Sequence, residues 1–324
     1  MRILVIGANG FLGSHLVDAF SALGHEVTAF DRFLRQAPRF DPTKAAVFKG
    51  DFLDNRDLAR AVAGQDEVFH FLSATTPITA QHDPTIDVRV NITQSIQLFA
   101  ECARARVKRI HFASTGGAVY GVSAKAPLIE DRSPQPKSPY AIGKLALEHY
   151  LEYFRLEAGL DYRVLRISNP YGPRQAPDRS QGLIPIALRR ILSGQPLTQF
   201  GDGSMVRDFI YVEDLTRMIR DTLEREGRHR TYNLGSGVGT SVSEVFALLR
   251  DITGRDFAVV RRSAPATFVN RAVLDISRFT ADFGEPSIRS LREGIQRTWD
   301  ELNGAKCTTG SEPGRSLFPA LRPT

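Results

Sequence analysis

The chain has 324 residues, of which 42% are apolar and 24% are charged, and it carries a net charge of +6. This composition is typical of a globular protein with a full hydrophobic core, and the length allows two substructures. No apolar run approaches the roughly 18 residues of a membrane span, and the N-terminus begins directly with a strand pattern, so we expect a cytoplasmic protein without a membrane partner. The arginines are scattered, which argues against nucleic-acid binding and fits a site for an anionic substrate. Cys102 and Cys307 provide neither a disulfide framework nor a metal-binding spacing.

The N-terminal segment predicts a dinucleotide-binding turn. Residues 2–6 form an apolar strand pattern, the turn Gly7-Ala8-Asn9-Gly10-Phe11-Leu12-Gly13 follows, and a helical pattern of apolar residues comes next. The glycines permit a tight turn and the close approach of a pyrophosphate, whose charge then meets the helix N-terminus. Because strand, turn and helix occur in this order, the motif is more specific than the glycines alone.

Two acidic residues follow the next two predicted strands. Residues 26–30 end at Asp31, about twenty residues after the glycine turn, where a carboxylate can accept both hydroxyls of an adenosine ribose and would repel a 2′-phosphate. NAD is therefore favoured over NADP, although the guanidinium of Arg32 could hold the extra phosphate, and Asp31 could simply end its strand. Asp51, in the third strand pattern (47–52), could bond the adenine amino group or cap the helix that starts near Asn55.

The remaining patterns predict a doubly wound parallel sheet, the α/β Rossmann arrangement. Strands are expected at 68–72, 109–113 and 163–167, alternating with helices. Residues 73–75 follow a strand at its carboxyl end, where such sheets bind ligands. We interpret His70 as a buried structural histidine rather than a catalytic one, residues 76–86 as a loop over the cofactor, and Asn91 as the start of a helix that includes Cys102.

Residues 138–144, Ser-Pro-Tyr-Ala-Ile-Gly-Lys, contain the strongest catalytic signal. Ser138 can cap a helix whose first residue is Pro139, so Tyr140 and Lys144 lie four residues apart on one helical face. A phenol alone titrates near pH 10, but a neighbouring ammonium group and the helix N-terminus favour the phenolate. Tyr140 is therefore predicted to be a general base.

These motifs, in this order, resemble the extended short-chain dehydrogenase/reductase family of NAD-dependent nucleotide-sugar epimerases and dehydratases. The resemblance covers residues 1 to about 300 and is nearest to the UDP-glucose 4-epimerase-like members. The matching motifs are the glycine turn, Asp31, Asp51, the Ser/Thr-rich strand end before Val119-Tyr120-Gly121, the Tyr140/Lys144 pair, Asn169-Pro170-Tyr171-Gly172-Pro173, and Phe200-Gly201-Asp202-Gly203 through Arg207-Asp208-Phe209.

The resemblance implies a role for each motif. Tyr140 would take a proton from a sugar hydroxyl while NAD accepts the hydride from the same carbon, and Lys144 would lower the Tyr140 pKa and bond the nicotinamide ribose. The cofactor contacts it implies are Gly7, Asn9, Gly10, Phe11, Leu12, Gly13, Asp31, Arg32, Asp51, Phe52, Leu72, Ser73, Ala74, Asn91, Tyr140 and Lys144.

A third catalytic hydroxyl is expected before Gly116. Relatives commonly place it four residues before the position of Tyr120, which here is Gly116, so Thr115 is the first candidate and Ser114 the second. Similar 4,6-dehydratases carry Asp-Glu after the threonine, because elimination of water needs an additional acid and base. This chain has Gly116-Gly117 there. The expected reaction is therefore epimerisation at C4 of a UDP-sugar with a glucose, N-acetyl or uronic acid group; a dehydratase, a reductase and a non-enzymatic NAD-sensing protein are the alternatives.

The resemblance also implies a substrate site in the C-terminal half. Asn169, Leu183, Gln199 and Phe200 match segments that contact the nucleotide sugar. Arg207 is the expected phosphate clamp, since a guanidinium group matches phosphate oxygens in pairs; alternatively it forms a salt bridge with Asp208 or Asp214. Arg271 and Arg262 are both candidates for a second clamp.

We expect residues 1–168 to bind the dinucleotide, with a return of the chain to the sheet over about 206–236, where 210–212 is the predicted strand. Residues 169–205 and 237–302 would form a smaller α/β substrate region, and 303–324 a flexible tail. The helices at about 91–105 and 139–156 carry apolar positions beyond one stripe, among them Ile142 and Tyr150. Related enzymes pair such helices, so a homodimer is expected.

Overall fold

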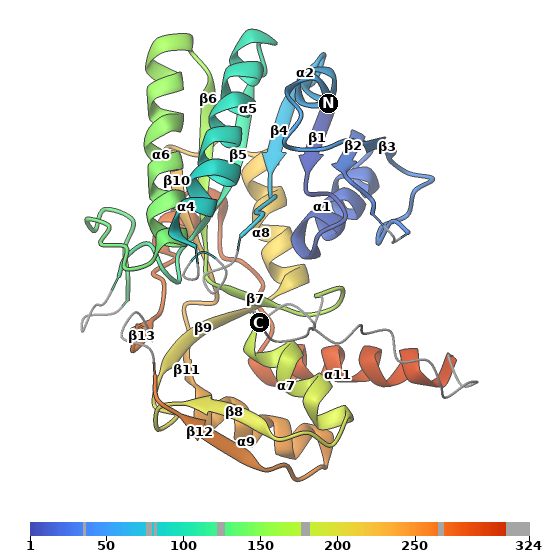
Figure 1. Cartoon of the computed structure of the whole chain (residues 1–324), viewed down its shortest axis with the longest axis vertical. Helices are drawn as coiled ribbons and strands as arrows, with labels where there is room; N and C mark the ends of the chain where they lie inside the picture. The colour runs from blue at the N-terminus through green and yellow to red at the C-terminus, as the bar shows by residue number, and fades with distance from the viewer. Residues whose placement is uncertain are drawn as a thin grey trace, which may run out of the picture.

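The structure, a computed structural model, describes residues 1–34, 37–75, 80, 83–121, 127–175, 182–264 and 269–308. Its larger part is a seven-stranded, wholly parallel sheet in the order β10-β6-β5-β4-β1-β2-β3 (Figure 1). The strands are β1 (Arg2–Ile6), β2 (Glu26–Asp31), β3 (Ala46–Lys49), β4 (Glu67–His70), β5 (Arg109–Thr115), β6 (Asp161–Ile167) and β10 (Thr231–Leu234). The predicted doubly wound α/β fold is confirmed.

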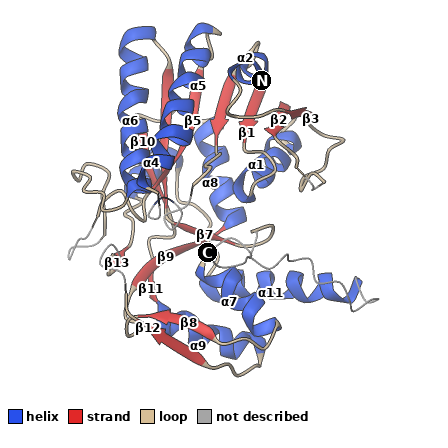
Figure 2. Cartoon of the chain, in the orientation of Figure 1, coloured by secondary structure: helices blue, strands red, loops and turns tan. Residues whose placement is uncertain are grey.

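Helices cover both faces of this sheet (Figure 2). Alternate residues of a strand point to opposite faces, and in β1 they enter two separate cores. Ile3 and Val5 pack with α1 (Phe11–Ala22), α8 (Val212–Glu224) and α10 (Ser277–Phe283). Leu4 and Ile6 pack with α2 (Asn55–Val62), α5 (Thr93–Arg104) and α6 (Pro139–Ala158). The sheet is thus buried on both sides, which explains its continuous apolar runs.

A smaller α/β part lies below the carboxyl ends of the large sheet in Figure 1. It contains a four-stranded sheet of β7 (Asn169–Tyr171), β9 (Val206–Tyr211), β11 (Gly239–Ser241) and β13 (Arg271–Ala272), and the pair β8 (Leu197–Phe200) and β12 (Val259–Arg262). Its helices α7 (Leu183–Leu192), α9 (Val242–Thr253) and α11 (Leu291–Thr308) enclose a third core.

Residues 210–212 do not rejoin the large sheet, so this detail of the prediction was wrong. Residues 209–211 of β9 pair with β7, which continues from β6 into the smaller part. The chain returns instead through α8, which packs against α1, and β10, which pairs with β6.

The predicted start of α6 is confirmed. Ser138 is its N-cap and accepts a hydrogen bond from the Ala141 N–H at 3.3 Å, and Pro139 is the first helical residue. Asn91 differs from its prediction, because it lies within the π-helical turn η1 (Val88–Ile92) between α4 (Pro84–Asp87) and α5. α11 runs beyond the predicted tail boundary to Thr308. Residues 76–79 and 81–82 of the predicted cofactor loop and residues 309–324 lie outside the described residues.

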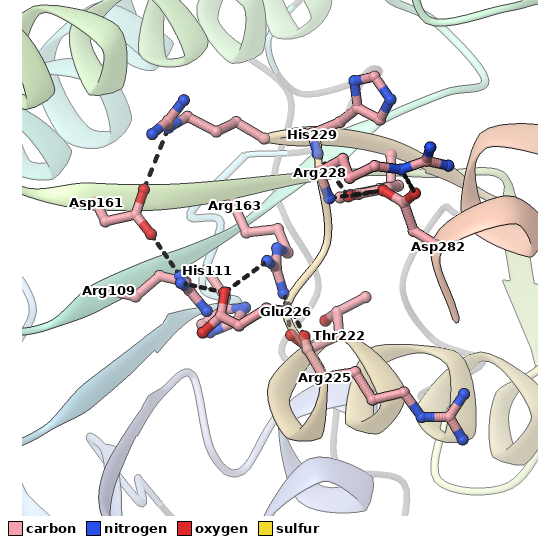
Figure 3. Close-up of polar contacts among 12 residues, drawn as sticks. Arg109, His111, Asp161, Arg163, Thr222, Arg225, Glu226, Arg228, His229 and Asp282 are labelled. Carbon is pink, nitrogen blue, oxygen red and sulfur yellow. Dashed lines mark hydrogen bonds and ion pairs between the residues drawn. The ribbon is translucent and has the colours of Figure 1, made fainter. Parts of the chain in front are cut away.

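Two buried arginines, one in β5 and one in β6, form polar contacts at the amino ends of these strands (Figure 3). Arg109 binds Asp161 at 2.7 Å and Glu226 at 2.9 Å, and Arg163 donates to the carbonyl of Thr222. Because Arg109 and Arg163 are buried, loss of a partner would leave an uncompensated charge. These arginines therefore link the chain at the amino ends of the strands, on the side of the sheet away from their carboxyl ends.

Membrane-spanning helices and metal-binding clusters are both absent among the described residues. None of their helices combines the length and the apolar character that a bilayer crossing needs. Nor do their His, Cys, Asp and Glu side chains form a group of three or more that could hold a metal ion.

Candidate functional site

A cleft of about 740 Å³ opens at the carboxyl ends of the large sheet, and both parts of the chain line it. Predicted site residues that line it are Asn9, Gly10, Phe11, Leu12, Gly13, Asp31, Arg32, Ser73, Ser114, Thr115, Tyr140, Lys144, Asn169, Leu183, Phe200 and Arg207. Predicted site residues outside this lining are Gly7, Asp51, Phe52, Leu72, Ala74, Asn91, Gln199 and Arg271. Most of the predicted site is therefore brought together.

The glycine turn forms a cradle at one end of the cleft. Gly7 has φ +86°, and a side chain there would come within 2.9 Å of the Leu72 backbone. A Cβ on Gly13 would lie 2.1 Å from the Gly7 carbonyl oxygen, so the helix packs directly on the turn. The N-cap of α1, Gly10, supplies no side-chain hydrogen bond. The free N–H groups of α1 thus face the cleft, and this arrangement fits a pyrophosphate.

Asp31 lies on the cleft wall beside Arg32. Its carboxylate accepts the Asn9 N–H at 3.0 Å and the Arg32 N–H at 2.7 Å. A carboxylate offers about four acceptor positions, so Asp31 retains capacity for ribose hydroxyls.

The alternative that Asp51 caps α2 was wrong. The N-cap is Asp54, which accepts the Arg56 N–H at 2.8 Å. Asp51 accepts the Leu53 N–H at 3.0 Å within the preceding turn.

Tyr140 and Lys144 lie on the same wall, as the helical spacing predicts. The Lys144 Nζ lies 5.9 Å from the Tyr140 ring centroid and donates to the Ala113 carbonyl at 2.8 Å. Burial lowers the pKa of Lys144 to about 8, while the negative charges of Asp87 and Glu148 oppose the shift. Lys144 is therefore a buried cation that remains largely charged at neutral pH.

The sequence predicts that Lys144 lowers the pKa of Tyr140. For the protein chain alone, this prediction was wrong. Burial, reinforced by the negative charge of Asp87, raises the pKa of Tyr140 to about 12. Asp87 is 3% exposed and accepts hydrogen bonds from Thr75 and Asn91. Sequence reasoning missed Asp87; its position four residues before Asn91 in a helical segment was the available signal.

Ser114 and Thr115 differ in the hydrogen bonds of their hydroxyl groups. The Ser114 hydroxyl donates to the carboxylate of Glu148, so the proton it could offer to a substrate oxygen is already engaged. Both residues line the cleft, but of these two hydroxyls that of Ser114 is the one that bonds to Glu148. Thr115 is thus the candidate hydroxyl.

The packing around Gly116 explains why residue 116 carries no side chain. A Cβ at Gly116 would lie 2.5 Å from a methyl carbon of Leu274 and 2.9 Å from the Arg166 carbonyl oxygen. At Gly117 the nearest atoms would be 3.8 Å away, on Asn169. A side chain therefore fits at Gly117 but not at Gly116.

His70 is 2% exposed, and its Nε2 lies 2.8 Å from the Ser95 hydroxyl. Burial lowers the pKa of His70 to about 3, so the ring is neutral. It borders a small cavity of about 10 Å³ beside Lys144 and does not line the cleft. The prediction of a buried histidine is confirmed.

Arg207 enters the cleft from β9. Its guanidinium donates to the Val206 carbonyl at 2.9 Å, and it has no ion pair with a described residue. The predicted alternative partners are engaged elsewhere: Asp208 accepts from residues 236, 237 and 274, and Asp214 pairs with Arg217 and Arg289. The salt-bridge alternative was therefore wrong. Burial lowers the pKa of Arg207, which indicates a charge that lacks a compensating partner.

Two predicted substrate residues do not reach the cleft. Gln199 is 6% exposed and donates to the Gly201 carbonyl at 3.4 Å, while its neighbours Thr198 and Phe200 line the cleft. Arg271 is exposed on β13, and Arg262 is exposed on β12. Strand alternation turns Gln199 away from the wall that Phe200 forms.

The fold and this cleft define a dinucleotide-binding α/β protein. Tyr140 and Lys144 lie on one wall of the cleft, termed the reactive wall. Residues 3–235 match the NAD-dependent epimerase/dehydratase family, and the chain belongs to that family. It is 34% identical to the UDP-glucose 4-epimerase of Mycolicibacterium smegmatis, over 92% of this chain and 97% of that protein.

Solved structures agree with this likeness. The UDP-glucose 4-epimerase of Thermotoga maritima, crystallised with UDP-glucose, superposes with a TM-score of 0.88 at 35% identity, covering 94% of this chain and 100% of that chain. The Thermus thermophilus UDP-glucose 4-epimerase, crystallised with NAD, gives 0.87 at 33% identity with the same coverage.

The contrast between the two glycines after Thr115 can be tested. Gly116→Ala is expected to lower the free energy of unfolding by about 1–3 kcal/mol, because the added methyl group overpacks against Leu274. Gly117→Ala, the matched control, should change it by less than about 0.5 kcal/mol. Urea unfolding of both variants checks this, and equal losses would contradict the steric explanation.

Proposed function

We propose that this protein is an NAD-dependent UDP-sugar 4-epimerase. The observation that carries the proposal is that Tyr140, Lys144 and Thr115 all line the cleft that the glycine turn also lines, with the Lys144 Nζ 5.9 Å from the Tyr140 ring centroid. Among the described residues that line the cleft, Asp31 is the one carboxylate, and it lies beside the glycine turn. Elimination of water from a sugar needs an acid and a base at C5 and C6. The described lining therefore favours epimerisation over dehydration.

The residues present fit NAD. The open N-terminus of α1 would hold the pyrophosphate, Asp31 the adenosine ribose, and Lys144 the nicotinamide ribose. When bound, NAD accepts a hydride from C4 of the sugar and returns it, and its oxidised ring adds positive charge beside Tyr140.

The chain's own groups handle the proton. As a phenolate, Tyr140 takes the proton of the sugar O4 while the C4 hydride leaves, so a 4-keto sugar forms. Thr115 would hydrogen-bond O4, and the charge of Lys144 would stabilise the phenolate. Return of the hydride to the other face of C4 and of the proton to O4 completes the epimerisation without net oxidation.

The cofactor-binding part would comprise residues 1–168 with α8 and β10, and the remaining segments to residue 302 would bind the substrate. Among the described residues of the second part, Arg207 is the cation that lines the cleft, and it would bind the diphosphate. We place the protein in the cytoplasm.

Removal of the Tyr140 phenol tests the reaction. Tyr140→Phe is expected to lower turnover by at least about 10²–10⁴-fold, because the group that receives the proton is lost. NAD affinity should change little, since the ring is kept. The assay is the conversion of UDP-glucose to UDP-galactose with catalytic NAD. A 4-keto-6-deoxy product from the wild type would refute the proposal, and so would an active variant.

Two arginines provide a matched test of the diphosphate site. Arg207→Met should raise KM roughly 10- to 100-fold, because a charge-assisted hydrogen bond contributes about 1.5–3 kcal/mol. Arg271→Met should leave KM within about twofold, because Arg271 is exposed and outside the lining. Initial rates against UDP-glucose concentration decide. A larger effect at Arg271 would transfer the role to that residue.

We also propose a homodimer whose interface includes α6. α6 exposes a stripe of large apolar side chains to solvent: Ile142 (53%), Tyr150 (40%), Tyr153 (53%) and Leu156 (66%). Large apolar side chains exposed along one helix favour a protein interface. Sedimentation equilibrium is expected to give twice the chain mass, and Tyr153→Glu should shift it toward the monomer. A wild-type monomer at micromolar concentration would contradict the dimer.

A further inference from the structure

Behind the reactive wall, a buried carboxylate joins two neighbouring strands to α6. Glu148, 8% exposed, accepts a hydrogen bond from the Ser114 hydroxyl and pairs with Arg166 at 2.7 Å. Ser114 in β5 and Arg166 in β6 are register partners, directly opposite each other. One carboxylate from the helix therefore holds both strands at the same level of the sheet.

This contact lies between the groups that would act on the substrate. The carbonyl of residue 113, just before Ser114, accepts a hydrogen bond from the Lys144 ammonium group. Thr115 directly follows Ser114. Lys144 lies on α6 one turn before Glu148, and Tyr140 two turns before it. The Ser114–Glu148 hydrogen bond thus couples the end of β5 to the helix that carries the tyrosine and the lysine.

Arg166 extends the connection to the turn after β5. Its guanidinium donates to the Tyr120 hydroxyl at 3.0 Å and to the Glu130 carbonyl at 3.2 Å, and the Tyr120 hydroxyl donates to Asn233 at 2.7 Å. Tyr120 ends the turn whose residues 117 and 118 line the cleft.

The electrostatic surroundings of Lys144 give Glu148 a second effect. The groups that face Lys144 are Tyr140 and Glu148 of its own helix, Asp87 of α4 and His70 of β4. His70 is neutral, so the two carboxylates are the charges that favour the ammonium form. Arg166 lies behind Glu148 and neutralises it in part.

We propose that Glu148 is a positioning residue that sets Thr115 against Tyr140 through Ser114 and keeps Lys144 charged. The proposal rests on the epimerase function proposed above, because Tyr140, Lys144 and Thr115 are its acting groups. A purely structural role for the Glu148–Arg166 pair would change stability but not the protonation of Lys144.

The test compares Glu148→Gln and Ser114→Ala with Glu152→Gln. Glu152 lies one turn further along α6 and pairs with Arg155, which makes it a matched control. Glu148→Gln keeps a hydrogen-bond acceptor for Ser114 but removes the charge. It should move the alkaline limb of the pH–rate profile to lower pH and so lower turnover roughly tenfold at a pH on that limb, because a nearby negative charge favours the ammonium form.

Ser114→Ala should lower turnover roughly tenfold with the alkaline limb unchanged, because the charge of Glu148 remains. Glu152→Gln should match the wild type in both measurements. The proposal is overturned if Glu148→Gln retains the wild-type alkaline limb, or if Ser114→Ala retains wild-type turnover. If Glu148→Gln does not fold, Glu148→Asp replaces it: this variant keeps the charge and should lose turnover with the alkaline limb in place, and wild-type turnover would overturn the proposal.

A second readout is independent of turnover. The Lys144 side chain can be titrated by NMR in lysine-labelled protein, with Lys144→Met assigning the signal. Glu148→Gln should lower the titration midpoint, and an unchanged midpoint overturns the proposal. If the wild type epimerises no UDP-sugar while this midpoint falls, the proposed function fails but the electrostatic role of Glu148 stands.

Discussion

Lys144 is 8% exposed, so its ammonium group is buried. The elements around it stabilise that positive charge. A buried cation without partners costs several kcal/mol. Here the Ala113 carbonyl accepts a hydrogen bond from the ammonium group, the Phe112 ring lies 4.6 Å from Nζ, and Asp87 and Glu148 carry opposite charge nearby. The contacts come from β5, α4 and α6. The packing of these three elements is therefore tied to the electrostatics of the reactive wall.

Close backbone packing shapes the cleft at two places. At the glycine turn, Gly13 packs on the carbonyl of Gly7, which brings the start of α1 against the sheet. After β5, Gly116 packs against Leu274 of the smaller part and the Arg166 carbonyl. The second contact leaves no room for a side chain at residue 116, so the hydroxyls at this strand end that line the cleft are those of Ser114 and Thr115. This constraint on residue 116 comes from its contact with Leu274.

The distribution of charge in the cleft matches an anionic ligand. Arg207 presents a guanidinium group that has no ion pair with a described residue, and Lys144 supplies a second cation. Asp31, the one carboxylate in the described lining, stands at the glycine turn, next to Arg32. A diphosphate would meet cations, while a sugar at Tyr140 would meet hydroxyl, phenol and amide groups. This polarity supports a redox step at a hydroxyl-bearing carbon more than an elimination.

The local patterns of the sequence were sufficient to predict the parallel sheet, the glycine turn and the helix capped by Ser138. Each depends on neighbours within a few residues: apolar periodicity, a glycine that permits close approach, and a serine that satisfies helix N–H groups. The pairing of Tyr140 with Lys144 follows from helical geometry alone. These features could be predicted because the interactions that produce them are short in range.

Only the tertiary structure decided how those parts act on one another. Ser114 could be separated from Thr115 only when Glu148 was found across the helix–sheet interface, 34 residues away. The direction of the Tyr140 pKa depended on burial and on Asp87, which reaches it from another element. Likewise, β9 joined the smaller sheet because β7 offered it a partner edge. Burial, charge and strand pairing between distant segments have no signature within a local stretch of sequence, and they determine the arrangement of this site.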